Sequence, residues 1–320
     1  MESSSSSLSL KAVEGCGEEE RNWLDLPQDV VCAIFQKLDA IEILTRAESV
    51  CSTWRSISKD PRLWRTIDLR NSGDMDLQLG ALCRRAIDFS SGHLLRLSIE
   101  NFGTDDLLHY ATDNTSHLRC LRLAYCYDIS DEGLREVAKK LPQLEELDIS
   151  ISNLTKYSLE AIGRCCPQLK SLKFNREGYR RPHIVCDEEA YAIAETMPKL
   201  CHLQLFGNKL TNDGLLAILD GCPHLESLDL RQCFNVNLVG GLGKRCAEQI
   251  KDLRLPYDPT DDYPFQSDID YGSFDGDYPS GISDIDFLSG DDYYDYDYYG
   301  FSGGSDFSDY DYEFENYYDL

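Results

Sequence analysis

The chain has 320 residues, enough for about two ordinary domains, and 57 acidic against 31 basic residues give it a net charge of −26. This charge disfavours nonspecific binding to nucleic acid and to anionic membranes. No apolar run approaches the roughly 18 residues that a membrane-spanning helix requires.

The two ends differ in composition from the middle. Residues 1–22 are rich in Ser, Glu and Gly and are expected to be disordered. They lack the basic and apolar stretches of a signal peptide, and the 13 cysteines are odd in number, without the spacing of a secreted disulfide framework. We therefore expect an intracellular protein, in the nucleus and/or the cytoplasm, with reduced thiols.

Residues 23–64 have the pattern of three short helices that end at Pro61. Pro27 suits the first position of a helix. The first helix would carry an apolar stripe at helical spacing, formed by Val30, Val31, Ile34, Phe35 and Leu38. The later two would carry Ile41, Ile43, Leu44, Val50, Trp54 and Ile57. Apolar residues fall on more than one face, so a partner or the adjoining domain must cover some of them.

A single motif, L-x-x-L-x-L, recurs through residues 65–257. Its seven copies begin at Leu94, Leu118, Leu144, Leu169, Leu200, Leu225 and Ile250. The L-x-L pair places both side chains on one face of a short strand. A small or polar residue follows three positions later in most copies, as at Cys126, Asn208 and Cys233. Between the copies lie amphipathic helical patterns, such as Asp131 to Leu141, with Asp131 as the expected N-cap.

One such unit cannot bury its own apolar face, so the units are expected to stack. The prediction is an α/β solenoid with short parallel strands inside and helices outside. Leu147 and Leu203 are expected to be almost fully buried. One unit, opening at Gln168, is longer than its neighbours, and its insertion includes Arg176, Arg180, Arg181 and His183. This basic stretch is either a tolerated surface loop or a site that meets negative charge, including the chain's own tail.

Residues 258–320 form an Asp/Tyr-rich tail. Nineteen acidic residues and no Lys or Arg fall between Pro256 and Leu320, among many Tyr and Phe residues. Because no aliphatic periodicity accompanies the aromatics and like charges repel in a compact state, the tail is expected to be disordered. It is either a solvating tail or a docking strip for a basic partner.

The helical segment resembles the F-box. The resemblance rests on Leu26-Pro27, Ile34-Phe35-x-x-Leu38, Ile43-Leu44, Val50-Cys51-x-x-Trp54-Arg55 and Asp60-Pro61-x-Leu63-Trp64, with Glu42 where many members have Asp. Together with cysteine-containing leucine-rich repeats, the chain is similar to F-box/leucine-rich-repeat proteins of the plant Skp-interacting-partner type. The resemblance implies the substrate-recognition subunit of an SCF (Skp–cullin–F-box) E3 ubiquitin ligase, bound through a Skp-type adaptor to a cullin–RING core.

By the same resemblance, eight residues would dock or shape the adaptor surface: Leu26, Pro27, Ile34, Leu38, Leu44, Val50, Cys51 and Trp54. For Phe35 and Ile57 we expect a place in the internal core instead. The early Leu-Pro is expected to make contact because it has little local core to join.

The candidate target surface is the outward face of the strands. Its expected members are Arg122, Asp148, Lys173, Gln204, Phe206, Asp229 and Arg231, with Arg180 and Arg181 from the insertion. Phe206 and Arg231 are the expected anchors, since exposed aromatics and arginines are the usual hot-spot residues. The mixed signs of charge leave the protein target unidentified.

No constellation for catalysis, metal binding or a cofactor is expected. The Gly240–Arg245 stretch lacks a P-loop pattern because Leu238 and Arg245 stand where Gly and Ser/Thr are needed. The chain has no C-x-x-C, and His93, His117 and His224 recur only because each precedes the first Leu of a repeat. The alternative to the ligase hypothesis is a leucine-rich-repeat scaffold whose helices bind another protein.

Overall fold

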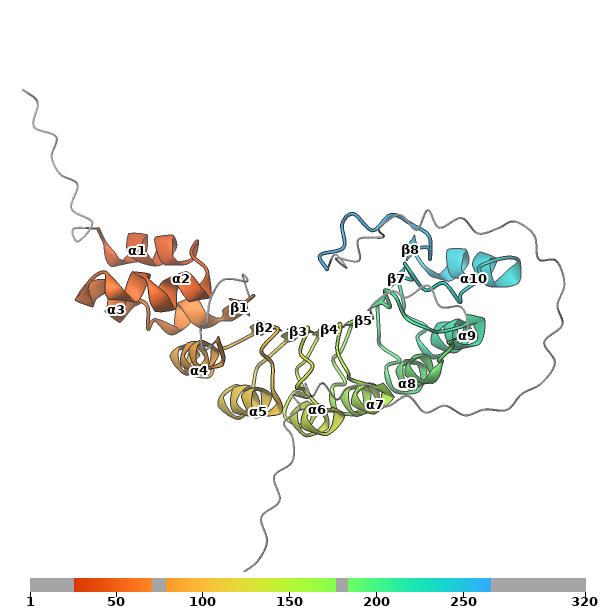
Figure 1. Ribbon diagram of the computed structural model, residues 1–320, viewed down its shortest axis with the longest axis horizontal. Helices are drawn as coiled ribbons and strands as arrows, with labels where there is room; N and C mark the ends of the chain where they lie inside the picture. Colours follow the sequence, from red (N-terminus) through yellow and green to blue (C-terminus); the bar gives the residue numbers. More distant parts are fainter. Residues whose placement is uncertain (1–25, 71–78, 177–183, 266–320) are drawn as a thin grey trace, which may run out of the picture. The chain divides into compact units, whose positions relative to one another are not determined.

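The computed structural model describes residues 26–70, 79–176 and 184–265. Within them, a short helical segment is followed by a parallel sheet whose successive strands are joined by helices (Figure 1). The predicted α/β fold class is confirmed. Residues 1–22 and the tail from residue 266 lie outside the described residues, as do Arg180, Arg181 and His183.

The helical segment has its own small core. It consists of α1 (Gln28–Phe35), α2 (Ala40–Thr45), η2 (Ala47–Ser49), α3 (Ser52–Ile57) and η3 (Pro61–Trp64). Phe35 and Ile57 are buried, as expected, and the Trp64 indole donates a hydrogen bond of 2.6 Å to the Ser58 carbonyl. Because α2 contacts the first strand and the helix that follows it, this core continues into the sheet.

Local sequence explains where the first two helices begin. Pro27 is the N-cap of α1, one position earlier than expected. Asp39 caps α2: its carboxylate accepts a 2.7 Å hydrogen bond from the Glu42 amide, and the Glu42 side chain accepts one from the Asp39 amide. This reciprocal pair satisfies two backbone donors that the first turn leaves without partners.

Eight parallel strands follow one another in chain order across one sheet. They are β1 (Thr66–Leu69), β2 (Arg96–Glu100), β3 (Cys120–Ala124), β4 (Glu146–Ser150), β5 (Ser171–Asn175), β6 (His202–Gln204), β7 (Ser227–Asp229) and β8 (Asp252–Arg254). The L-x-L positions are in register, so Leu121, Leu147, Leu172, Leu203 and Leu228 form one buried row. The predicted burial of Leu147 and Leu203 is confirmed.

Helices cover one face of this sheet (Figure 1). They are α4 (Leu79–Ser90), α5 (Asp105–Asn114), α6 (Asp131–Ala138), α7 (Lys156–Cys165), α8 (Glu188–Thr196), α9 (Asn212–Gly221) and α10 (Gly241–Gln249). In α6 the side chains of Leu134, Val137 and Ala138 face the core. Adjacent helices also contact one another, and the stack therefore buries faces that no single unit could cover.

The expectation that Asp131 caps α6 is wrong by one residue. Ser130 is the N-cap, and the Asp131 carboxylate reaches the next unit, where it accepts hydrogen bonds from the Thr155 amide (2.9 Å) and hydroxyl (2.6 Å). Asp105 binds Ser130 in the same way, as Asp187 binds Thr211. Each carboxylate thus fixes the N-terminus of the following helix.

Four residues that stand three positions after an L-x-L pair are buried: Cys126, Ser152, Asn208 and Cys233. The Cys126 and Cys233 thiols donate to carbonyl oxygens of the preceding unit, Ile99 and Leu205, and Asn208 accepts from the Leu210 amide. The residue just before this position is left-handed in several units, with φ of 52° at Tyr125, 57° at Ile151 and 68° at Gly207. This conformation favours glycine, so a branched Ile there needs compensating contacts.

Residues 256–265, named the strap here, correct the predicted start of the disordered tail at residue 258. Arg231 donates to the Pro259 carbonyl at 3.0 Å, and the Gln232 amide donates to the Pro256 carbonyl at 2.8 Å. Tyr263 and Phe265 are buried. The chain therefore keeps an ordered path for several residues beyond the last repeat.

Candidate functional site

The helical segment leaves apolar side chains uncovered on α1 and at the start of α3. The stripe on α1 is wider than its core requires, because Val31 and Phe35 are buried while Val30 is 40% exposed. Val50 is 58% exposed, Pro27 is exposed, and Leu26 is half-buried. Exposed apolar residues from two elements mark an interaction surface better than any one of them alone. Val30 was not among the predicted contact residues, although the stripe included it.

The other predicted contact residues are partly or fully covered. Ile34, Leu38, Cys51 and Trp54 are half-buried. The Trp54 ring packs edge-on against Phe35, with centroids 5.2 Å apart. The Cys51 sulfur accepts a hydrogen bond from the Trp54 amide at 3.4 Å and caps α3. Leu44 is only 3% exposed, so it supports the surface from within and does not offer contact area in this structure.

The predicted target-binding residues on the strands form one row. The strand register places Arg122, Asp148, Lys173, Gln204 and Asp229 side by side. Arg122 pairs with Glu100 at 3.3 Å and with Asp148 at 3.6 Å. The Lys173 side chain is 50% exposed, and its ammonium lies 3.9 Å from Asp148. Lys173 is therefore the charge in this row with most freedom to meet another molecule.

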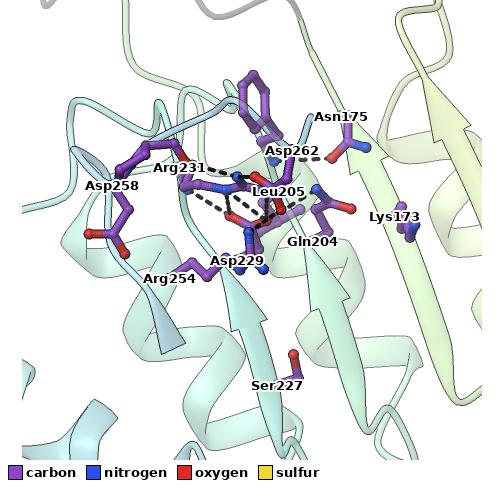
Figure 2. A network of polar contacts seen from close by, with 12 residues as sticks. Lys173, Asn175, Gln204, Leu205, Ser227, Asp229, Arg231, Arg254, Asp258 and Asp262 are labelled. Carbon is purple, nitrogen blue, oxygen red and sulfur yellow. Dashed lines mark hydrogen bonds and ion pairs between the residues drawn. The ribbon is translucent and has the colours of Figure 1, made fainter. Parts of the chain in front are cut away.

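At the C-terminal end of the row, Arg231 is held between two carboxylates (Figure 2). Its guanidinium donates to Asp229 at 2.8 Å and pairs with Asp262 of the strap. Arg254 also pairs with Asp262, at 2.5 Å, and Gln204 donates to Asp229 at 3.1 Å. Hydrogen bonds from Arg254 and Arg231 lower the pKa of Asp262 to about 2, so this carboxylate is charged across the physiological range.

An aromatic cluster lies next to this ion-pair network. The Tyr263 ring stacks on Phe206 with centroids 3.6 Å apart and an interplanar angle of 4°. Phe265 meets the Tyr125 ring edge-on at 5.4 Å, and the Arg122 guanidinium lies 5.1 Å from the Phe265 centroid. With Ala124 and Ile151, these rings form an apolar cluster separate from the main core.

The strap overturns the expectation that Phe206 and Arg231 are exposed anchors. Phe206 is 4% exposed and Arg231 is 3% exposed, because Asp262, Tyr263 and Phe265 cover them. The strap could not be distinguished from the tail by composition, because both are rich in Asp, Tyr and Phe. The signal that could have found it is the short distance of Tyr263 and Phe265 from the last repeat strand, which ends at Arg254.

A cavity of about 260 Å³ lies beside the strap. The sheet contributes Ser171, Lys173, His202, Gln204, Ser227, Asp229, Arg231, Asp252 and Arg254 among its lining residues, and the strap contributes Asp262, Tyr263 and Pro264. The Tyr263 hydroxyl is buried and has no hydrogen-bond partner in the part of the chain that the structure describes, and burial raises its pKa. The cavity wall is therefore mixed in charge, and one of its residues carries an unsatisfied donor.

Of the predicted basic insertion, the structure describes Arg176. Its guanidinium donates to the Ser152 carbonyl and, at 2.5 Å, to the Leu154 carbonyl, and it pairs with Glu189 at 3.0 Å. Arg176 thus ties neighbouring units together, and its charge is already matched. The predicted contacts of Arg180 and Arg181 lie outside the described residues.

Two family models match the chain: an F-box-like model over residues 23–70, and a leucine-rich-repeat model over residues 115–138 and 196–219. The chain is 49% identical over 284 residues to the F-box protein SKIP19 of Arabidopsis thaliana, covering 87% of this chain and 90% of that protein. The chain belongs to the F-box/leucine-rich-repeat family.

A second relative supports the same assignment along the whole repeat region. The putative F-box/LRR-repeat protein 22 of Arabidopsis thaliana is 44% identical over 287 residues, covering 88% of this chain and 92% of that protein. The F-box match extends to residue 70, so it includes η3 and β1 as well as the three helices. The F-box and the first repeat therefore share residues, consistent with their continuous core.

Metal sites, membrane spans and reactive thiols can be checked directly in the described part of this F-box protein. Its residues hold no cluster of three or more His, Cys, Asp or Glu placed to bind a metal ion. No helix among them is long and apolar enough to cross a bilayer. Burial raises the pKa of the Cys83 and Cys166 thiols to about 12, so both remain protonated and poorly nucleophilic at neutral pH.

Proposed function

We propose that this protein is the substrate-recognition subunit of an SCF-type E3 ubiquitin ligase. One observation carries the proposal: a single chain joins an F-box at residues 23–70 to an eight-stranded repeat sheet, with family relatives that match both parts. The F-box would dock a Skp-type adaptor and, through it, a cullin–RING core. The repeat sheet would hold a protein target near the ubiquitin-transfer machinery.

No covalent step on this chain is needed for that role. Holding a target beside the transfer machinery raises the effective concentration of its lysines, which is a rate gain from proximity. The buried, protonated thiols of Cys83 and Cys166 agree with a non-catalytic receptor. The ligase core would supply the reactive groups.

The adaptor would contact the apolar residues that the F-box leaves uncovered. Pro27, Val30 and Val50 offer the most accessible apolar area, and half-buried Leu26, Ile34, Leu38, Cys51 and Trp54 would complete the surface. Leu44 would act by holding α2 in place. Their burial against an adaptor would remove apolar area from water, the main driving force of such interfaces.

The target would bind the strand face that the strap leaves open. Lys173 is half-exposed there. In the next row of the sheet, Arg96 and Glu146 form an exposed ion pair at 3.1 Å. Such exposed pairs contribute little to folding, so a target can exchange partners with them at small cost.

A matched pair of substitutions tests adaptor docking. Val50→Glu places a charge on the proposed surface, where Val50 is 58% exposed; Val239→Glu makes the same change at a site 71% exposed beside α10. Neither site is in the core, so both variants should fold. By isothermal titration calorimetry with a purified Skp-type adaptor, we expect Val50→Glu to weaken binding at least about thirtyfold, the scale of an interface hot spot. Val239→Glu should bind like the wild type.

A double substitution probes the other edge of the surface. Leu26→Ala with Pro27→Ala should cost at least about 2 kcal/mol of adaptor binding, while the melting temperature of the repeats stays unchanged. If wild-type protein shows no adaptor binding at all, the alternative of a repeat scaffold outside a ligase is favoured. Unchanged affinity in both F-box variants would place the docking surface elsewhere.

A further inference from the structure

The strap sits on the sheet face in the way that a bound peptide would. Three of its four consecutive residues 262–265 make side-chain contacts of different chemistry. Asp262 pairs with two arginines, Tyr263 stacks on Phe206, and Phe265 packs beside Tyr125. The face therefore fits a segment with the sequence order acidic residue, aromatic residue, any residue, aromatic residue.

We propose that this face is a docking site for an external protein segment of the order Asp-aromatic-x-Phe, and that residues 262–265 are a resident occupant which such a segment displaces. The inference deepens the proposed function, because it names the chemistry of one class of target. The binding event itself does not depend on the ligase.

The aromatic half of the site selects for flat rings at two places. The Tyr263 and Phe206 planes differ by 4°, so the first position is a slot for a stacked ring. The second ring, Phe265, lies edge-on to Tyr125 and 5.1 Å from the Arg122 guanidinium. Rigid aromatic side chains bury large area at a small entropic cost, which makes them effective anchors.

The half of the site that binds the acidic residue is a pair of arginines, Arg231 and Arg254, in a strongly acidic chain. Asp229 and Arg231 form two parallel contacts, with Arg231 Nη2 and Nε donating to Asp229 at 2.8 and 3.0 Å. This fixes the guanidinium so that Nη1 faces the strap carboxylate. Arg254 adds a second, partly exposed charge at 2.5 Å. A carboxylate placed between two guanidinium groups, of which Arg231 is fixed, is recognised by charge and by direction.

The backbone under the aromatic rings is left-handed. Tyr125 and Ile151 have φ of 52° and 57°, at the repeat position where another unit has Gly207. Side chains at such positions cost conformational energy, and here both belong to the apolar cluster that also contains Tyr263 and Phe265 of the strap. Burial of these side chains against the strap offsets part of that cost.

The resident occupant fits imperfectly, which allows its replacement. The buried Tyr263 hydroxyl has no hydrogen-bond partner among the described residues, and Tyr263 is also one of the residues that line the cavity of about 260 Å³. The Asp262 side chain is 56% exposed. A segment with Phe at the first aromatic position avoids the unsatisfied hydroxyl, and should therefore bind better than the strap's own sequence.

The tail carries the order Asp-aromatic-x-Phe once more, at Asp311-Tyr312-Glu313-Phe314, and the same order with Tyr in last place at residues 295–298 and 309–312. The experiment must therefore separate an external segment from these copies. The parent protein for the test is the full chain with Tyr296→Ala, Tyr298→Ala, Tyr312→Ala and Phe314→Ala, named the tail-silent protein. The probe is a fluorescein-labelled peptide with the sequence of residues 259–267, measured by fluorescence anisotropy.

Release of the strap should open the site. Tyr263→Ala with Phe265→Ala in the tail-silent protein should bind the probe at least tenfold more tightly than the tail-silent protein does. Tyr191→Ala, which removes a partly exposed ring on α8, is the matched control and should leave probe affinity unchanged. A probe with Phe for its Tyr should bind more tightly still. Equal affinity for closed and released proteins, with both folded by circular dichroism, would overturn the proposal.

A charge swap tests the site without disturbing its core. Arg254, 42% exposed, is changed to Glu in the released protein, which should weaken the probe at least tenfold. A probe with Lys in place of the Asp that corresponds to Asp262 should recover affinity for this variant only. Failure of that rescue would refute the role of Arg254 in binding the acidic residue.

A last comparison tests whether the tail occupies the site. If restoring Tyr312 and Phe314 to the released protein blocks the probe, the site belongs to the tail and the external-partner assignment is wrong. Adaptor binding, measured in parallel, reports separately on the proposed function.

Discussion

Tyr263 lies flat on Phe206, with ring centroids 3.6 Å apart, although one residue belongs to the strap and the other follows strand β6. The stack removes from solvent the aromatic that the repeat pattern marks as an exposed anchor. A leucine-rich repeat presents its strand face to partners, and here the chain itself covers the C-terminal part of that face. What the strap leaves open, and what can displace it, decide how much of the sheet a target can use.

The unsatisfied Tyr263 hydroxyl predicts a stabilising substitution. Tyr263→Phe keeps the stacked ring and removes a buried polar atom that no described residue satisfies. Because such a group costs about 1–3 kcal/mol, we expect the free energy of unfolding to rise by about 1 kcal/mol in a urea titration. Tyr157→Phe, at a site 52% exposed, should change it by less than about 0.5 kcal/mol. A destabilised Tyr263→Phe protein would mean that the hydroxyl has a partner in solution.

The repeat spacing and the F-box motif were readable from the sequence because both are local. Apolar residues at alternate strand positions, such as Leu147 and Ile149, specify which face is buried without knowledge of any distant residue. Tyr263 and Phe265 could not be placed in that way, since their burial depends on Phe206 and Tyr125, far along the chain. Local composition therefore grouped them with the tail.

The misplaced helix cap has a similar cause. Ser and Asp are both good N-cap residues, and Ser130-Asp131 offers one of each. The choice is made by Thr155 of the next unit, which uses the Asp131 carboxylate as its acceptor.

In the F-box, helical spacing predicted an apolar stripe on α1, but it could not divide that stripe between core and surface. The packing of α3 against α1 through Trp54 and Phe35 determines which residues are covered.

Charge in the strand core should unfold the repeats. Leu147 is 1% exposed in the middle of the sheet, so Leu147→Asp buries a carboxylate without a partner, at a cost of several kcal/mol. We expect a large drop in the melting temperature measured by circular dichroism, or no folded protein. Leu216→Asp, on α9 and 36% exposed, is the control and should melt close to the wild type. Indistinguishable melts for Leu147→Asp and wild type would contradict the strand register.

Acid should loosen the strap through Asp262. The two arginines lower the pKa of this carboxyl from 3.8 to about 2. Because the pKa is lower when the strap is in place, the stabilisation is fully present above about pH 4 and is lost as the pH falls through about 2. Carbon-13 NMR of the Asp262 carboxyl should give a midpoint near 2, and Arg254→Ala should move it towards 3.8. Circular dichroism on the same samples shows whether the sheet is still folded. A wild-type midpoint at 3.8 would show that the ion pairs do not form in solution.

The carboxylates that join successive units should contribute to stability one by one, and Asp131 offers the clearest case. It accepts hydrogen bonds from the Thr155 amide and hydroxyl and from the Ser158 hydroxyl, all in the following unit. Asp131→Ala leaves these donors without their acceptor, so we expect the free energy of unfolding to fall by about 2 kcal/mol. Glu132→Ala, one residue on, removes an exposed carboxylate and should cost less than about 0.5 kcal/mol.

The pH dependence of stability gives a second readout for the same residue. Burial acts to raise the Asp131 pKa, but the hydrogen bonds from Ser158 and Thr155 outweigh it and hold the pKa below 3.8. Asp131 therefore stabilises the fold above about pH 4 and loses this contribution as the pH falls through its lowered pKa. In Asp131→Asn this titration is absent, so unfolding free energy should fall less steeply below pH 4 than in the wild type. Parallel curves for the two proteins would show that the Asp131 contacts add no stability.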